Sequence, residues 1–146
     1  MTEAQAKTPG HVWAVGLAAV LFNAIGAFDY VMSKTQGAAY MSAGGMTPEQ
    51  IAFIQEYPTW MDVVWPTGVW TAFVASLLIL ARRKAAFPLF VISLAAFLLN
   101  QLYIHVLTNG GDILGPSMGV ISAVITAELV ALIWYTHAQT RRGVLR

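Results

Sequence analysis

The chain has 146 residues, of which 58% are hydrophobic and 10% are charged, and its formal net charge is +1. Soluble domains carry about 25% charged residues, so this composition excludes an ordinary soluble globular protein and requires lipid around the chain. The small net charge gives no support for a nucleic-acid partner. Because the sequence has no cysteine, disulfides and cysteine-ligated metal centres are also excluded.

Four apolar stretches are each long enough to cross a bilayer, whose hydrocarbon core of about 30 Å needs roughly 20 helical residues. They predict spans over residues 11–33, 60–81, 85–107 and 116–137. A cleaved signal peptide is the alternative for the first stretch, but Glu3 precedes it and its apolar run is long, so we expect a span. The predicted fold is all-α: one membrane domain of four antiparallel transmembrane helices in one bundle.

The connections between the spans carry their own signals. The turn Arg82-Arg83-Lys84 is so short that the second and third spans must be antiparallel neighbours. The third and fourth spans are joined by Thr108-Asn109-Gly110-Gly111-Asp112, a turn-forming segment, and Pro116 suits the first turn of the fourth helix. In the long first connection, Thr47-Pro48-Glu49-Gln50 is a capping box. It predicts a short amphipathic external helix over residues 48–56.

Charge is segregated between alternate connections. Seven of the eight basic residues lie on one side of the predicted bundle: Lys7, Arg82, Arg83, Lys84, Arg141, Arg142 and Arg146. The acidic residues Asp29, Glu49, Glu56, Asp62 and Asp112 lie on the other, with Lys34 as the basic exception. Basic loops remain in the cytoplasm. The pattern predicts a multi-pass protein of the bacterial inner membrane, with both termini cytoplasmic.

Glu128 is the ionisable residue predicted to lie near the middle of a span. Insertion of the comparable Asp, Lys or Arg at mid-helix costs about 2.5 to 3.5 kcal/mol, so we expect Glu128 to be neutral, hydrogen-bonded or beside water. It is either a proton or cation relay or ligand anchor, or a hydrogen-bonding link between helices. Asn23 is the expected partner, and the candidate intramembrane polar layer consists of Asn23, Asn100, Tyr103 and Glu128.

A second polar set gathers toward the outer ends of the predicted spans. Its members are Asp29, Tyr30, Asp62, Trp65, Gln101, His105 and Asp112. They would line an external vestibule for a solute, or they form an ordinary interfacial belt. No metal site is expected, because His105 lacks a second ligand at close spacing.

Small residues repeat along two spans, as they do where membrane helices approach closely. The second span carries Gly68, Ala72 and Ser76, and the fourth carries Gly119, Ser122, Ala123 and Thr126. Glu128 points almost opposite to the second of these stripes. With Glu128 turned inward, either stripe is a candidate homodimer interface within the bilayer.

Motifs spread over nearly the whole chain suggest a family. They are Phe22-Asn23, Gly26, Asp29-Tyr30, Met32, Tyr40-Met41, Pro58, Trp60, Leu77-Leu78 before Arg82-Arg83, Ser93-Leu94 and Arg142-Gly143-Val144-Leu145. In these the chain resembles a group of small, mostly uncharacterised four-span bacterial inner-membrane proteins, some automatically labelled "sugar transporter". The resemblance implies no catalytic residues. The family pattern often has tryptophan before the asparagine, so Phe22 is a departure.

Nucleotide-binding loops, the serine-hydrolase elbow and the His-Glu-x-x-His motif are absent from the sequence. The sequence therefore favours a small integral inner-membrane protein that binds, or helps to move, a small polar solute without a cofactor. One alternative is an accessory or assembly subunit of a membrane complex. Another, with less support, is a membrane enzyme acting on a lipid or a quinone.

Overall fold

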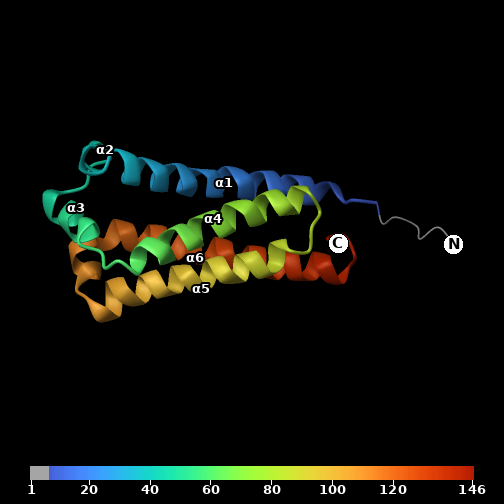
Figure 1. Ribbon diagram of the computed structural model, residues 1–146. Helices are drawn as coiled ribbons and strands as arrows, with labels where there is room; N and C mark the ends of the chain where they lie inside the picture. The colour runs from blue at the N-terminus through green and yellow to red at the C-terminus, as the bar shows by residue number, and fades with distance from the viewer. Residues whose placement is uncertain (1–6) are drawn as a thin grey trace.

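Four long helices form the body of the molecule (Figure 1). They are α1 (Gly10–Thr35), α4 (Met61–Leu80), α5 (Ala86–Leu102), which continues as the π-helical turn η1 (Tyr103–Leu107), and α6 (Gly110–Arg141). The computed structural model describes residues 7–146, in which no strand is found, and helix makes up 81%. All four are long and apolar enough to cross a membrane. The prediction of an all-α bundle with four spans is confirmed.

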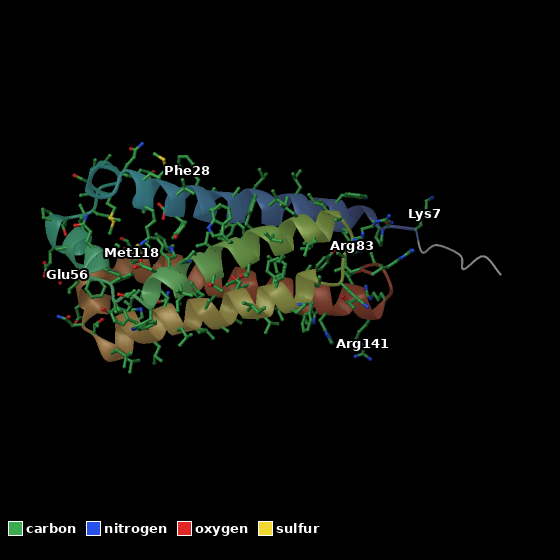
Figure 2. All side chains as sticks on the ribbon, viewed as in Figure 1. Lys7, Phe28, Glu56, Arg83, Met118 and Arg141 are labelled. Atoms are coloured by element: carbon green, nitrogen blue, oxygen red, sulfur yellow. The ribbon has the colours of Figure 1, made fainter. Side chains whose placement is uncertain are left out.

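Successive long helices run antiparallel (Figure 1). Helix α4 packs against both α1 and α5, and α5 packs against α6. We call the end that carries the C-terminus and the α4–α5 turn the basic end; Lys7, Arg83 and Arg141 all lie there (Figure 2). The opposite end, which carries Glu56, is the capped end. The charge segregation in the sequence is thus a segregation between the two ends of the bundle.

Two short helices cover the capped end: α2 (Ala38–Ala43) and α3 (Pro48–Gln55). The capping box of α3 is present, since Thr47 Oγ1 accepts from the Gln50 amide at 3.2 Å and Gln50 Oε1 accepts from the Thr47 amide at 3.0 Å. Helix α2 was not predicted. Its six residues lie between Gly37, with φ of 54°, and the pair Gly44-Gly45, so the segment has the composition of a loop.

Helix α6 is kinked near its beginning, where Gly115 has φ of 79° and Pro116 follows. Proline has no amide hydrogen to donate to the preceding turn. Gln50 of α3 donates to two carbonyls beside this break: its Nε2 lies 3.2 Å from the Ile113 carbonyl and 3.1 Å from the Leu114 carbonyl. The helix therefore starts at Gly110, earlier than the predicted span, whereas its straight part starts at the predicted Pro116.

Helices α1 and α4 converge toward the basic end and diverge toward the capped end (Figure 1). At the narrow part, a Cβ added to Gly16 would lie 2.5 Å from Leu80 Cδ2, so glycine leaves room here for the side chain of Leu80. At the wide part, the Tyr30 ring packs edge-on against Trp65 and Trp70, with centroid distances of 5.2 and 6.4 Å. Side-chain size thus follows the spacing between the two helices.

The C-terminal residues close the basic end. Val144 and Leu145 are buried there. The Arg146 amide donates to the Arg82 carbonyl at 2.8 Å, and the Lys84 amide donates to the Arg146 carbonyl at 3.0 Å. The main apolar core lies in this half of the bundle and includes Val12, Ile79, Ala86, Phe90, Leu132 and Val144. Polar side chains bridge the helices both in this half of the bundle and toward the capped end.

Candidate functional site

Asn23 of α1 and Glu128 of α6 meet near the middle of the bundle. Asn23 Nδ2 donates to Glu128 Oε1 at 2.8 Å, which is the contact expected from the sequence. The same amide nitrogen lies 3.1 Å from Ser76 Oγ and 3.0 Å from the Ala19 carbonyl. Ser76 Oγ in turn donates to the Ala72 carbonyl at 2.8 Å. The Asn23–Glu128 pair is therefore anchored to α4 as well as joining α1 to α6.

The second carboxyl oxygen of Glu128 is in a different position. Glu128 Oε2 is buried, and no residue of the described range hydrogen-bonds to it. Buried polar groups in proteins are nearly always paired, and leaving one unpaired costs about 1 to 3 kcal/mol. In Glu128, Oε1 is therefore hydrogen-bonded to Asn23, whereas Oε2 is left free by the described residues to form a hydrogen bond with another group.

A second polar contact links α1 and α6 nearer the basic end. His11 Nδ1 and the Tyr135 hydroxyl share a hydrogen bond of 2.7 Å. Tyr135 lies seven residues after Glu128, which is about two helical turns and places both side chains on one flank of α6. The face of α6 toward α1 therefore carries two polar side chains, Glu128 near the middle of the bundle and Tyr135 nearer the basic end.

Asn100 and Tyr103 do not join the predicted polar layer. Ser93 Oγ donates to the Gly68 carbonyl at 2.7 Å, and Gly68 lies about 12 Å along α4 from Ser76 toward the capped end. Asn100 is displaced a further 10 Å or so in the same direction along α5. Residues aligned on one helix face can differ widely in depth, and the prediction neglected this.

Tyr103 belongs to an aromatic cluster under α3. Its ring lies 6.3 Å from Phe53, 5.5 Å from Tyr57 and 5.5 Å from Trp60, measured between centroids. Burial raises the pKa of Tyr57 to about 12, so its phenol stays neutral at physiological pH. The cluster fixes α3 on the capped end and leaves Tyr103 without a role at Glu128.

The residues of the predicted vestibule divide into two groups. The first lies between α1 and α4 at the capped end. Lys34 Nζ forms a salt bridge of 2.7 Å with Asp62 and stands 5.5 Å from the ring centroid of Trp65, which packs on Tyr30. Asp29 accepts a 3.0 Å hydrogen bond from the Tyr40 hydroxyl. This bond raises the pKa of Tyr40.

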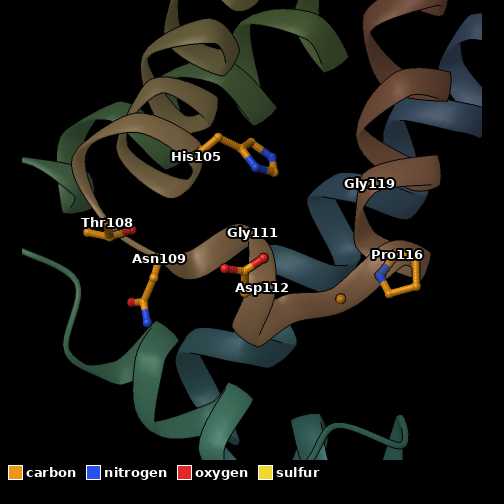
Figure 3. Close-up of a pocket in the computed structure, with 8 residues that line it drawn as sticks. His105, Thr108, Asn109, Gly111, Asp112, Pro116 and Gly119 are labelled. Carbon is orange, nitrogen blue, oxygen red and sulfur yellow. The ribbon is translucent and has the colours of Figure 1, made fainter.

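The second group lies between the end of α5 and the kinked start of α6. A pocket of about 520 Å³ opens there (Figure 3). It is lined by His105, Thr108, Asn109, Gly111, Asp112, Gly115, Pro116 and Gly119. Gly111 gives room for the imidazole, since a Cβ at this position would lie 2.5 Å from His105 Nδ1. Gln101 lies nearby in sequence but points to α6, where its Nε2 donates to Ser122 Oγ at 2.8 Å.

This pocket is separate from the Asn23–Glu128 pair. Gly119 on the pocket wall and Glu128 are nine residues apart, or two and a half turns, so they face opposite sides of α6. Tyr30, which belongs to the first group, lies on the same face of α1 as Asn23, because the two residues are seven positions or about two turns apart. The residues predicted to line a single vestibule thus lie at two places, of which the second has a pocket.

The two small-residue stripes also differ in the structure. Ala72 and Ser76 are buried and Gly68 lies against Ala96 of α5, so the α4 stripe packs inside the bundle. On α6, Ser122 and Thr126 are half-buried beside α5, whereas Gly119 and Ala123 are exposed. Part of the α6 stripe remains free on the outer surface.

Two participants were assigned differently from the sequence. Ser76 was read as a packing residue, although its hydroxyl accepts from Asn23. Lys34 was read as the exception to the charge rule, although it pairs with Asp62 and stacks on Trp65. Lys34 follows Asn23, Gly26 and Tyr30 at steps of three and four residues, and this spacing could have placed Lys34 on the same face of α1. No comparable signal marked Ser76.

Four spanning helices and a polar pair at mid-bundle define a multi-pass membrane protein. Within residues 7–146, no group of three or more metal-ligating side chains comes together. Comparison of the chain with models of protein families, with curated proteins and with solved structures found no match. The function is therefore inferred from the geometry of the site.

Proposed function

We propose that the protein is a small multi-pass protein of the bacterial inner membrane, with both termini cytoplasmic, that binds or helps to move a small polar solute. Glu128 is the intramembrane anchor for this solute. The observation that supports the proposal is the buried Oε2 of Glu128, to which no described residue donates a hydrogen bond. Gln101 Oε1 and Gln139 Oε1 are also buried without a donor from the described range, but Glu128 is the ionisable residue among the three. A solute that carries a hydroxyl or an amine would supply the missing donor.

A purely structural link between helices explains the site less well. Such a link is most stable when every buried polar atom is paired. Asn23 satisfies Oε1 from one side and is itself fixed by Ser76, so the pair already joins α1 to its neighbours without Oε2. The unpaired Oε2 then only lowers the stability of the folded protein, unless a ligand donates a hydrogen bond to it.

One face of α1, between Asn23 and the capped end, supports a route by which a solute would reach Glu128 from the capped end. Asn23, Gly26, Tyr30 and Lys34 are spaced by three and four residues and share one face of the helix. Gly26 is exposed and a Cβ there would meet no atom within 4 Å, so no described side chain covers α1 between Asn23 and Tyr30. The salt bridge of Lys34 to Asp62 marks the outer end of this line.

Tryptophan fluorescence of the protein reconstituted in lipid vesicles tests the proposal, since Trp65 and Trp70 pack on Tyr30. The probes are glucose, glycerol and ethanolamine, which present hydroxyl and amine donors. We expect a saturable change with at least one probe. Glu128→Gln should weaken that binding by about 2- to 10-fold, because a hydrogen bond contributes about 0.5 to 1.5 kcal/mol.

The matched control is Glu49→Gln, which changes the same residue type at an exposed position in the first turn of α3. Its binding curve should match that of the wild type. If none of the probes gives a saturable response, or if Glu128→Gln binds as the wild type does, the solute-binding proposal is wrong.

An accessory or assembly role is the second candidate. It is favoured by the outer face of α6, where Gly119 and Ala123 are exposed beside Val120 and Val124. Small residues at a surface let a second membrane helix approach closely. A second copy of this chain or another membrane subunit would fit this face. A protein with that role alone would give no saturable response in the solute titration.

A further inference from the structure

An apolar groove runs between α5 and α6 near the basic end. It has a volume of about 420 Å³ and is lined by Phe87, Leu94, Val130, Ile133, Trp134 and His137. The rings of Phe87 and His137 lie 5.2 Å apart at its mouth. His137 is the only polar residue among the six. The groove opens on the surface that faces lipid, because the Trp134 side chain is 71% exposed.

Two basic residues lie close along the chain to residues that line this groove. Lys84 lies in the turn before α5, where its carbonyl accepts from the Phe87 amide at 3.2 Å. Arg141 follows His137 by one turn on the same face of α6. Both are exposed. In the described range every acidic residue except Glu128 lies toward the capped end, where the salt bridge of Lys34 and Asp62 is found. Lys84 and Arg141 therefore bring positive charge to the end of the bundle at which the groove lies.

We propose that this groove is a binding site for an anionic phospholipid. One acyl chain lies along Leu94, Val130 and Ile133, and the phosphate lies between Lys84 and Arg141, with the His137 ring at the boundary. The apolar walls match an acyl chain, and the two basic groups require a negative headgroup. The site uses other residues than the Asn23–Glu128 pair, so it stands independently of the proposed solute.

Trp134 makes the site measurable, because brominated acyl chains quench tryptophan fluorescence on contact. The protein is reconstituted in phosphatidylcholine vesicles that contain either brominated phosphatidylglycerol or brominated phosphatidylcholine. The part of the quenching that disappears in Trp134→Phe reports the groove. We expect phosphatidylglycerol to be preferred there by at least fivefold, since each basic residue near a membrane surface contributes roughly that factor.

Two double variants with equal net charge separate a site from general attraction. Lys84→Gln with Arg141→Gln should reduce the preference to about onefold. Lys7→Gln with Arg82→Gln should keep it, because Arg82 hydrogen-bonds to Thr8 beside α1, away from the groove. Equal quenching by the two lipids, or the same loss in both double variants, would show annular lipid only and overturn the proposal.

Discussion

Phe90→Ala is expected to lower the free energy of unfolding in lipid by about 2 kcal/mol, mainly through the cavity that it leaves. Phe90 is 0% exposed and lies in the core at the basic end of the bundle. In soluble proteins this substitution costs about 3 to 5 kcal/mol, which includes transfer of the ring to water. A span that unfolds within the bilayer stays in an apolar medium, so the packing part remains. Titration with a denaturing detergent measures the change.

Phe28→Ala is the matched control, because Phe28 is 59% exposed on α1 and loses few contacts. Its edge-on contact with Tyr40 limits the expected loss to about 1 kcal/mol. Equal destabilisation by the two substitutions would mean that Phe90 is not in the interior of the bundle.

Asn23→Leu should destabilise the bundle by about 1 to 3 kcal/mol, because it removes the donor to Glu128 and leaves both carboxyl oxygens without one from the described residues. The double variant Asn23→Leu/Glu128→Leu should recover most of this loss, since replacing both partners by apolar groups can be nearly neutral. The same detergent titration, applied to the two single variants and the double variant, gives the coupling.

Asn100→Leu is the control for this cycle, since it exchanges the same half-buried residue type in α5 away from the pair. Measured couplings between polar side chains in membrane proteins average about 0.6 kcal/mol and reach about 1.7 kcal/mol. We expect a value near the upper limit. Strictly additive effects of Asn23→Leu and Glu128→Leu would contradict the hydrogen bond between them.

Features set by local sequence were predictable. The length of the apolar stretches predicted the four spans, because a helix pairs the backbone hydrogen-bonding groups of such a stretch within the segment itself, as lipid requires. The capping box gave α3, because Thr47 and Gln50 satisfy each other's backbone amides over a few residues. The Asn23–Glu128 contact was also predictable, since a mid-span carboxyl needs a donor and Asn23 is an amide at mid-depth in α1.

Features set by the relative depth and rotation of the helices were not predictable. The shared face of Ser93, Asn100 and Tyr103 gave no information on their spread of about 15 Å along α5. Helix rotation decided that His105 and Asp112 face a pocket on the side of α6 opposite to Glu128. The tail residues Val144 and Leu145 fold back into the core through contacts with the distant α4–α5 turn.

The structure separates stability from proposed function along the length of the bundle. Close packing at Gly16, Phe90 and Leu145 holds the basic half together. Toward the capped end, α1 and α4 diverge and are bridged by Tyr30, Trp65 and the salt bridge of Lys34. The Asn23–Glu128 pair lies where the two halves meet.

Infrared difference spectra of the reconstituted protein, recorded with and without glucose, glycerol or ethanolamine, observe the carboxyl group of Glu128 directly. A probe that hydrogen-bonds to Oε2 should shift a carboxyl band, and Glu128→Gln should abolish this shift while Glu49→Gln keeps it. If no probe shifts a carboxyl band, or if the shift persists in Glu128→Gln, then Glu128 serves only to hold α1 and α6 together.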